Sequence, residues 1–425
     1  MKITVIGLGY IGLPTAILFA KYGHKVTGVD LSPLMTAQLN AGLIHIEEPG
    51  LEKDLEEVLL SGNFYASTKP VSTDVYIIAV PTPNKTDQYQ SCDTSYIEAA
   101  LARILPYVKA GDTIIVESTI APRTMVDVVQ PMVEKDGFTV GEDIFLAHCP
   151  ERVLPGNIMH ELVHNPRIIG GITDACTEKA AAVYGTFVKG EMMKTQAGEA
   201  ELSKLMENTY RDVNIALANE LAKISNHLGI NALRVIEMAN KHPRVNIHQP
   251  GPGVGGHCLA VDPYFVIAAS PEQSPLMQTA RAVNNSMPAY VVQQVQALMA
   301  EQEGNQVTLF GLTYKGNIDD IRESPAMEVK EGLHEAGFEV RVFDPHVSEQ
   351  PLTGEEACEG SSLIVVLSDH NEFRNIPTDY TDRMREAMVF DTKNIVQHVG
   401  TKVNYVNYGN LYKVKRTQKA AIVQS

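Results

Sequence analysis

One cysteine of this chain ends a loop that is suited to close approach of a ligand. Residues 251–258 read GPGVGGHC, and five of these eight residues are Gly or Pro. So many glycines cost chain entropy on folding, which a plain connecting loop has no reason to bear. Cys258 ends this glycine loop, and Asp262 follows four residues later. Because a thiolate attacks carbonyl carbons well, we predict that Cys258 is a nucleophile. The alternative, a small buried cysteine, is what we expect for Cys92, Cys149, Cys176 and Cys358.

A second set of polar residues has the spacing of one helix face. Lys204 and Asn208 are four residues apart in a stretch of helical periodicity, and Asp212 continues the same face. An ammonium beside an amide stabilises an oxyanion, although a solvated helix stripe has the same pattern. Glu151 comes directly after a predicted strand, at the end where open α/β sheets bind ligands. We predict that these groups act with the cysteine.

The N-terminal segment has the sequence of a dinucleotide site in its expected context. Residues 7–12 read GLGYIG, after a strand-like run and before a helical one. Glycines permit the tight turn and bring the helix N-terminus to the pyrophosphate, whereas a ligand-free glycine turn is the alternative. Asp30 ends the next strand-like run, where a carboxylate accepts from the ribose hydroxyls. No Arg follows it to receive a 2′-phosphate, so NAD is favoured over NADP and over FAD. The predicted NAD contacts are Gly7, Gly9, Tyr10, Ile11, Gly12 and Asp30.

These residues must be positioned by strands and helices that alternate in both terminal parts of the chain. The strand-like runs lie at residues 2–7, 25–30, 75–80, 113–117 and 144–148, and again at 306–312, 340–344, 363–368 and 388–391. Strands separated by helical stretches are typical of a parallel sheet covered on both faces. Each part also runs from a strand through a glycine turn and a helix to a strand ending in Asp, at Asp30 and Asp344. Only the first part carries the full glycine fingerprint.

A long helix is predicted between these two parts. Residues 199–228 contain neither Pro nor Gly, and Gly229 follows as a stop signal. Such a helix is about 45 Å long, enough to join two domains and to leave surface for a partner subunit. We therefore expect an α/β protein with two Rossmann-like, doubly wound parallel-sheet domains joined by a long central helix and a helical domain. The expected boundaries are 1–198 for the cofactor domain, 199–303 for the helical domain with the cysteine loop, 304–412 for the second Rossmann-like domain, and 413–425 for a solvated tail.

Composition limits the partners of the chain. With 425 residues, 44% hydrophobic and 20% charged, it is typical of a globular protein of two or three domains. A net charge of -16 opposes nucleic-acid binding and requires clustered Arg and Lys wherever an anion binds. We see no signal peptide and no apolar run near the ~20 residues of a membrane span, so we expect a cytoplasmic protein without a membrane partner. The five cysteines show no CxxC spacing, and we expect no metal site.

Six motifs in fixed order resemble the UDP-glucose/GDP-mannose dehydrogenase family over residues 1 to about 412. They are GLGYIG (7–12), EST (117–119), CPERVLPG (149–156), KLMENTYRD (204–212), GVGGHCLAVDP (253–263) and FGLTYKGNIDDIRESPA (310–326). The resemblance implies an NAD-dependent enzyme that oxidises the C6 hydroxyl of a UDP-linked sugar to a carboxylate. Two hydride transfers are implied, with a thiohemiacetal and then a thioester on Cys258.

The resemblance also implies roles for single residues. Lys204 and Asn208 would stabilise the oxyanions, and Asp262 would orient water or act with Lys204 as a base. Glu151 would assist proton transfer, and Thr119 would lie near the nicotinamide. Lys315 and Arg322 would hold the uridine diphosphate, and Arg244 would reach the sugar of a neighbouring subunit, so a homodimer or larger homo-oligomer is implied. The full set of implied substrate contacts is Arg152, Val153, His242, Arg244, Gly255, Lys315 and Arg322.

Departures from the family pattern bear on the sugar. UDP-glucose members usually carry Lys where this chain has Val261, and a usual Lys before Ser-Thr is here Glu117. The segments CPERVLPG, HPRVNI (242–247) and GGHCLAVDPYF (255–265) resemble members that oxidise UDP-N-acetyl-D-mannosamine. An acetamido sugar needs a polar partner for its amide, which His242 or Arg244 would provide. UDP-N-acetylglucosamine and UDP-glucose are the alternative substrates.

Two other classes of function are compatible with part of this pattern. A two-electron dehydrogenase of 3-hydroxyacids or 6-phosphogluconate shares the layout of a Rossmann domain and a long helix. It has no need of Cys258 and would form one NADH per substrate. A non-enzymatic NAD-sensing or scaffold protein would make the set of Cys258, Lys204 and Asn208 coincidental. The role of His257, next to the predicted nucleophile, stays open between tuning the thiol and packing in the loop. The family suggests surface polysaccharide synthesis as the pathway.

Overall fold

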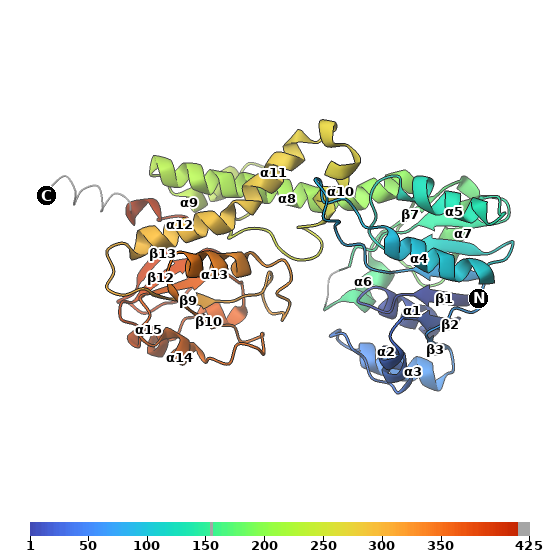
Figure 1. Ribbon diagram of the computed structural model, residues 1–425, viewed down its shortest axis with the longest axis horizontal. Helices are drawn as coiled ribbons and strands as arrows, with labels where there is room; N and C mark the ends of the chain where they lie inside the picture. The colour runs from blue at the N-terminus through green and yellow to red at the C-terminus, as the bar shows by residue number, and fades with distance from the viewer. Residues whose placement is uncertain (154–155, 415–425) are drawn as a thin grey trace. The chain divides into compact units, whose positions relative to one another are not determined.

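The structure of the chain is a computed structural model that describes residues 1–153 and 156–414 (Figure 1). The described residues form two compact units. Unit 1 comprises residues 1–207 and 264–271, and unit 2 comprises residues 208–263 and those from 272 onward. Leu154 and Pro155 of the CPERVLPG motif lie outside the described residues, as do residues 415–425 of the predicted tail.

Unit 1 is built on an eight-stranded sheet with the order β3-β2-β1-β4-β5-β6-β7-β8. Its strands are β1 (Lys2–Ile6), β2 (Lys25–Val29), β3 (Phe64–Ser67), β4 (Val75–Ile78), β5 (Thr113–Val116), β6 (Phe145–His148), β7 (Arg167–Gly171) and β8 (Met192–Gln196). Neighbouring strands are parallel except for β6 and β7, which pair antiparallel. Because alternate residues of a strand point to opposite faces, Ile77 joins one hydrophobic cluster and Ile78 the other.

Helices cover both faces of this sheet. One cluster is completed by α1 (Gly12–Lys21), α2 (Pro33–Asn40), α3 (Leu51–Leu60), α6 (Ile158–His164) and α7 (Asp174–Tyr184). The other is completed by α4 (Ser95–Ile104), a π-helical turn η2 (Met125–Val129) and α5 (Gln130–Lys135), with a 3-10 turn η1 (Leu105–Tyr107) after α4. Strands with helices on both faces confirm the predicted doubly wound arrangement.

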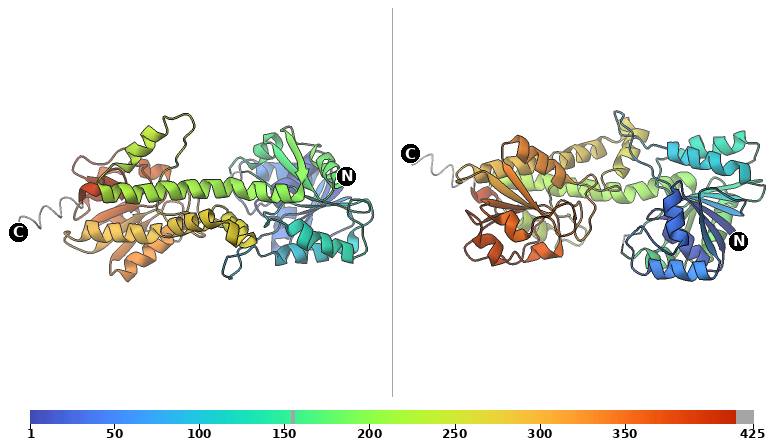
Figure 2. Two further views of the ribbon diagram at one scale, coloured as in Figure 1. Left: turned by 90° about the horizontal axis from the view of Figure 1, so that it is seen from above. Right: turned by 60° about the horizontal axis from the view of Figure 1, so that its bottom comes forward.

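A single unbroken helix, α8 (Ala197–Leu228), follows β8 (Figure 2). It has 32 residues and begins two residues before the predicted stretch 199–228, and it ends at the predicted residue. The division between the two units falls inside this helix. The elements after it are α9 (Ala232–Ala239), α10 (Asp262–Ala269), a 3-10 turn η3 (Pro271–Gln273), α11 (Pro275–Asn285) and α12 (Met287–Met299). In the described part of the chain, none of the helices combines the length and apolar character that crossing a bilayer requires.

Unit 2 contains a five-stranded parallel sheet with the order β10-β9-β11-β12-β13. Its strands are β9 (Gln306–Phe310), β10 (Glu339–Phe343), β11 (Leu363–Val366), β12 (Met388–Asp391) and β13 (Asn404–Asn407). Figure 1 shows α12 and α13 (Pro325–Glu335) on one side of it, and α14 (Gly354–Cys358) and α15 (Thr378–Asp382) on the other. A 3-10 turn, η4 (Asn371–Arg374), follows β11. The predicted fold class, with two Rossmann-like sheets and a long helix, is therefore confirmed.

The two sheets begin with the same local construction. The Leu8 N–H donates to the Asp30 carboxylate at 3.1 Å, and the Leu312 N–H donates to the Asp344 carboxylate at 2.7 Å. In each case the aspartate ends the second strand in sequence and its oxygen accepts from the turn after the first. The shared pattern of glycine turn and terminal Asp thus corresponds to one structural motif used twice.

Candidate functional site

The loop between β1 and α1 is shaped to present backbone N–H groups to an anion. α1 begins at Gly12, and neither an acidic residue nor a side-chain cap occupies its N-terminus. A Cβ at Gly12 would lie 1.9 Å from the Gly7 carbonyl oxygen, so only glycine permits this turn. A Cβ at Gly9 would meet no heavy atom within 4 Å, which leaves room for a ligand. Together with Tyr10 and Ile11, the predicted cofactor residues form one turn at a helix N-terminus, the arrangement that binds a pyrophosphate.

Asp30 is fixed in the position from which a carboxylate binds ribose hydroxyls. Its Oδ2 accepts from the Leu8 N–H and its Oδ1 from the Ser32 N–H at 3.0 Å. An ionised carboxylate offers about four lone-pair sites, so acceptor capacity remains for a ligand. Ser32 caps α2, and Leu31 is exposed, so no cation follows Asp30 in this turn. These residues fit NAD, whose adenosine ribose has free hydroxyls.

Thr119 lies at the carboxyl end of the same sheet. It follows β5, and its carbonyl oxygen accepts from the Thr82 hydroxyl at 2.6 Å. The preceding Ser118 hydroxyl donates to the Val80 carbonyl at 2.7 Å, which ties this segment to the end of β4. The Thr119 side chain is half-buried at the sheet edge where doubly wound folds bind ligands.

Glu151 belongs to a buried cluster of two carboxylates that share one arginine. Arg167, the first residue of β7, contacts Glu151 at 2.7 Å and Glu117 at 2.6 Å. Glu117 also accepts from the hydroxyls of Tyr184 at 2.6 Å and Thr15 at 3.2 Å. The Arg167 guanidinium lies over the Tyr184 ring, 3.9 Å from its centroid. This cluster fixes the carboxylate of Glu151 in one orientation.

The electrostatics of this cluster are unbalanced. The side chains of Glu117 and Arg167 are almost fully buried, and two carboxylates face a single cation. Burial raises the pKa of Glu117 above that of an ordinary glutamate. The negative charge of Glu151 raises this pKa further, whereas the positive charge of Arg167 lowers it. Sequence reasoning missed Arg167 and Tyr184. The one available indication was a cation at the start of the apolar run RIIGG (167–171).

The two residues after Glu151 have separate surroundings. The Arg152 N–H donates to the Glu151 carboxylate at 2.7 Å, and its guanidinium contacts Glu207 at 2.5 Å and the Pro166 carbonyl. Val153 packs against the larger hydrophobic cluster of unit 1. The structure thus places both predicted substrate contacts directly beside Glu151.

Lys204 does not lie on a solvated stripe. Its exposed fraction is 9%, within the part of α8 that belongs to unit 1. Burial, with a contribution from the Lys204 charge, lowers the pKa of His148 to about 3. His148 lies at the end of β6, three residues before Glu151, and its Nδ1 is 2.9 Å from the Val116 carbonyl oxygen. Within unit 1, Lys204 therefore acts on the β6 end of the sheet, the same end that carries Glu151.

In unit 2 the predicted amide and acid form a direct pair. The Asn208 side-chain N–H donates to the Asp262 carboxylate at 2.6 Å, and both residues are buried. Asp212, one turn further along α8, instead contacts Arg281 at 2.6 Å and accepts from Asn284 at 2.8 Å. The structure therefore joins Asn208 to Asp262 and assigns Asp212 to a separate buried cluster with Arg281 and Asn284.

Cys258 differs from the other four cysteines in exposure. All five lie among the described residues, and Cys258 is exposed whereas the others are buried. Burial raises the pKa of the Cys149 thiol to about 12, which suppresses its thiolate. The Cys258 carbonyl accepts from the N–H groups of Val261 at 3.0 Å and Asp262 at 2.9 Å, a turn that leads into α10. The glycine loop thus ends in an exposed thiol, one turn away from the Asp262 carboxylate.

Lys315 and Arg322 lie on the loop between β9 and α13, residues 311–324, which we call the β9–α13 loop. Both side chains are exposed. The Arg322 guanidinium contacts Asp320 at 2.7 Å, and the charge of Arg322 contributes to holding the pKa of Asp320 below its ordinary value, against burial. Exposed cations on a loop at the carboxyl end of a parallel sheet are positioned to bind an anionic ligand.

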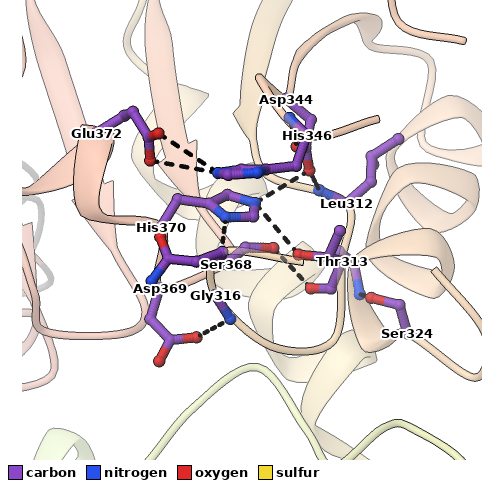
Figure 3. A network of polar contacts seen from close by, with 12 residues as sticks. Leu312, Thr313, Gly316, Ser324, Asp344, His346, Ser368, Asp369, His370 and Glu372 are labelled. Carbon is purple, nitrogen blue, oxygen red and sulfur yellow. Dashed lines mark hydrogen bonds and ion pairs between the residues drawn. The ribbon is translucent and has the colours of Figure 1, made fainter. Parts of the chain in front are cut away.

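The base of the β9–α13 loop is anchored by a buried histidine, His370 (Figure 3). The Asn317 N–H donates to its Nδ1 at 2.8 Å, and its Nε2 lies 3.2 Å from the Thr313 hydroxyl and 3.3 Å from Asp344. Figure 3 also shows His346 stacked on this ring, with Glu372 beside it. His346, His370 and Glu372 have ligand atoms within 4.8 Å of one another, but both nitrogens of His370 already have partners. The cluster therefore holds a loop and does not fit a metal.

His242 and Arg244 lie on the exposed loop after α9. The Arg244 N–H contacts the His242 ring at 3.3 Å. Asn240 closes this loop, because its side chain donates to the Ile247 carbonyl at 2.9 Å and accepts from the Ile247 N–H at 2.7 Å. Both predicted sugar contacts are thus presented on one closed loop of unit 2.

Comparison with known proteins extends over nearly the whole chain. Residues 1–188 match the NAD-binding domain of the UDP-glucose/GDP-mannose dehydrogenase family, residues 198–286 its central domain, and residues 308–398 its UDP-binding domain. The UDP-N-acetyl-D-mannosamine dehydrogenase of Methanococcus maripaludis is 46% identical, with 93% of each chain covered. The NDP-N-acetyl-D-galactosaminuronic acid dehydrogenase of Ralstonia nicotianae is 43% identical, covering 92% of this chain and 96% of that one.

Solved structures of nucleotide-sugar dehydrogenases are also similar to this chain over nearly its whole length. The UDP-N-acetyl-mannosamine dehydrogenase of Staphylococcus aureus is 58% identical with a TM-score of 0.91, covering 98% of this chain and 100% of the other. A UDP-glucose dehydrogenase of Pyrobaculum islandicum is 27% identical with a TM-score of 0.82, covering 96% and 97% of the two chains. Similarity of this extent includes every motif that carried the sequence predictions.

Proposed function

Because this chain belongs to the UDP-glucose/GDP-mannose dehydrogenase family, whose members are NAD-dependent oxidoreductases acting on nucleotide sugars, we propose that it oxidises C6 of UDP-N-acetyl-D-mannosamine to the carboxylate. The observation that carries the chemical part of this proposal is the exposed Cys258 at the end of the glycine loop. The other four cysteines are buried. A four-electron oxidation needs a group that holds the aldehyde between its two steps, and an exposed thiol supplies one.

The reaction is balanced as one alcohol, two NAD+ and one water giving one carboxylate, two NADH and three protons. NAD, when bound, accepts one hydride in each of the two oxidations. The C6 hydroxyl first loses its proton to a base, and the C6 carbon loses a hydride, which leaves an aldehyde. The Cys258 thiolate adds to that carbon to form a thiohemiacetal, whose oxidation yields a thioester. Water then breaks the C–S bond, and the thiolate leaves.

The described residues divide these tasks between the units. In unit 1, Lys204 supplies a buried cation for the oxyanions, and Glu151, held by Arg167, moves protons in thioester formation and hydrolysis. In unit 2, Asn208 supplies an amide donor, oriented by its 2.6 Å hydrogen bond to Asp262. Asp262, in the same unit, orients water or acts as the base. A preorganised donor contributes most where it does not have to reorient during the reaction.

The sugar is proposed from the relatives and from three segments of the chain. Relatives named for UDP-N-acetyl-D-mannosamine cover 92% or more of the chain, and one named for an N-acetyl-D-galactosaminuronic acid is 43% identical. His242 and Arg244 lie together on an exposed loop and supply polar partners for an acetamido group. The test is a panel of UDP-N-acetylmannosamine, UDP-N-acetylglucosamine, UDP-N-acetylgalactosamine and UDP-glucose. We expect the highest kcat/KM with the first, and equal turnover of UDP-glucose would overturn the acetamido specificity.

We also propose that α8 pairs with a second copy of the chain. Tyr210, Leu217 and Ile224 are exposed large hydrophobic residues at seven-residue intervals, and Leu228 extends the row. Repetition every seven residues places side chains on one seam of a helix, and such a seam is self-complementary. A homodimer along this seam is the assembly that the exposed row supports.

A further inference from the structure

The loop that carries Cys258 packs directly on the loop that carries Arg322, and both belong to unit 2. A Cβ at Gly255 would lie 2.3 Å from the Glu323 carbonyl oxygen. A Cβ at Gly256, whose φ is +83°, would lie 2.6 Å from the Tyr314 ring. Glycine fits at these two positions because the glycine loop packs on the backbone of the β9–α13 loop at Gly255 and on the Tyr314 ring of that loop at Gly256. A change in the position of one loop therefore displaces the other.

His257 is the side chain of the glycine loop that reaches the charges of the β9–α13 loop. Its Nδ1 lies 3.5 Å from the Arg322 guanidinium and 3.7 Å from the Asp320 carboxylate, and its ring meets the Tyr314 ring edge-on with centroids 6.1 Å apart. A neutral ring can accept at Nδ1 from the guanidinium, which only donates, whereas a protonated ring donates at Nδ1 toward the Asp320 carboxylate. Burial and the Arg322 charge lower the pKa of His257, whereas Asp320 acts in the opposite direction.

The balance of charge around His257 depends on what Arg322 binds. At present Arg322 donates to both oxygens of Asp320, at 2.7 and 2.9 Å, and the two charges offset each other. A diphosphate bound at Arg322 adds at least two negative charges to this cluster. It also competes with Asp320 for the guanidinium. Both effects favour a positive charge on the neighbouring imidazole, because opposite charges within about 4–6 Å stabilise the charged form.

We propose that His257 couples nucleotide binding to the reactivity of Cys258: a diphosphate at Arg322 promotes protonation of His257, and this cation promotes the thiolate of the adjacent Cys258. His257 is then a positioning residue that acts through the thiol and does not touch the reacting carbon. The proposal rests on the proposed function, which places the diphosphate at Arg322 and the nucleophile at Cys258. The groups that face His257 are Asp320, Arg322 and Tyr314 of the β9–α13 loop.

The test uses alkylation of the full-length protein by iodoacetamide, measured across pH with and without UDP. Cys258 is the exposed cysteine of the five, so it is the residue that reacts. In the wild type we expect UDP to lower the pH midpoint of alkylation by about one unit. At pH values below the midpoint, this shift raises the alkylation rate about tenfold. Steric shielding by UDP slows alkylation at every pH and does not move the midpoint.

The variant His257→Gln keeps a polar side chain but cannot carry the charge. We expect its midpoint to be the same with and without UDP, whereas the control His248→Gln, a partly buried histidine of the same unit, shifts as the wild type does. Calorimetric titration with UDP accompanies each protein. Bound UDP without a shift in the wild type, or an equal shift in His257→Gln, overturns the inference and leaves the proposed function intact. Failure of the wild type to bind UDP would remove the proposed nucleotide site itself.

Discussion

Asn208 and Asp262 are joined by a 2.6 Å hydrogen bond between two buried side chains, one on the long helix α8 and one at the start of α10. They are 54 residues apart in sequence. A side-chain amide has two N–H donors, and the bond to Asp262 fixes the plane in which the second one lies. Asp262 follows Cys258, whose thiol is exposed, by four residues, and its N–H donates to the Cys258 carbonyl at 2.9 Å. The pair therefore links the amide donor of α8 to the segment of unit 2 that carries Cys258.

Removing the amide should slow the reaction without loss of cofactor binding. We expect Asn208→Ala to lower kcat by about 10²–10³-fold, the usual cost of deleting one preorganised oxyanion donor. The KM for NAD should stay within about twofold of the wild type. The control is Asn226→Ala, which removes another buried asparagine of α8 that donates to Tyr290. It should lower the melting temperature and leave kcat unchanged, and equal effects of both variants on kcat would contradict the assignment.

The repeated motif of the two sheets offers a matched pair for the cofactor site. We expect Asp30→Ala to raise the KM for NAD by roughly 10- to 100-fold, because a hydrogen bond to a charged group contributes about 1.5–3 kcal/mol. Asp344→Ala removes the same local contact in the second sheet. Its KM for NAD should match the wild type, as measured by initial rates at saturating nucleotide sugar. Similar KM increases in both variants would mean that Asp30 acts on the fold and not on NAD.

The cluster around Arg167 predicts a pH dependence of stability. Burial raises the folded-state pKa of Glu117 above 4.5. The protonated side chain therefore stabilises the fold fully below pH 4.5, and this stabilisation is lost as the pH rises through the folded-state pKa. Glu117→Gln should therefore gain stability relative to the wild type between pH 5 and pH 8, measured as urea midpoints. The exposed Glu178→Gln on α7 should show the same difference at both pH values. A relative loss of stability by Glu117→Gln at pH 8 would show that the ionised carboxylate is well accommodated.

The exposed row on α8 predicts a dimer that one charge disrupts. Leu217 is 52% exposed in the single chain, and Leu217→Lys should weaken association by about 30-fold or more, the size expected of a central interface residue. Sedimentation velocity at micromolar concentration measures the change. Leu60→Lys, on a leucine of α3 that is 90% exposed, is the control and should sediment as the wild type does. A wild-type monomer, or no effect of Leu217→Lys, would place any interface elsewhere.

Local sequence patterns were sufficient to predict the main elements. The GLGYIG turn, the terminal Asp30 and Asp344, and the long helix α8 follow from residues close together in the chain, and the structure has all of them. Strands β3, β7, β8 and β13 were not predicted. Part of the reason is composition, because β8 reads MMKTQ and has no fully buried residue. The antiparallel direction of β7 has a different reason: β7 reads RIIGG and is buried throughout, and no local pattern states in which direction a strand runs beside its neighbour.

The partners of the candidate site residues depend on contacts that no local pattern contains. Arg167 contacts Glu117, 50 residues away, only because β7 lies beside β6 and β6 beside β5 in the sheet. His257 meets Arg322 across 65 residues because the glycine loop packs on the β9–α13 loop. Spacing predicted which residue types belong to the site, whereas the sheet order and the loop packing determine which of them touch.

The most direct test of the central claim is the amount of NADH formed per molecule of UDP-N-acetylmannosamine consumed, in the wild type and in Cys258→Ser. The control is Cys176→Ser, since Cys176 is buried and its sulfur accepts from the Leu146 N–H at 3.3 Å, a bond that serine reproduces. We expect two NADH per uronate in the wild type and in the control, and no uronate from Cys258→Ser although it still binds NAD. One NADH per sugar, or full uronate production by Cys258→Ser, would contradict it.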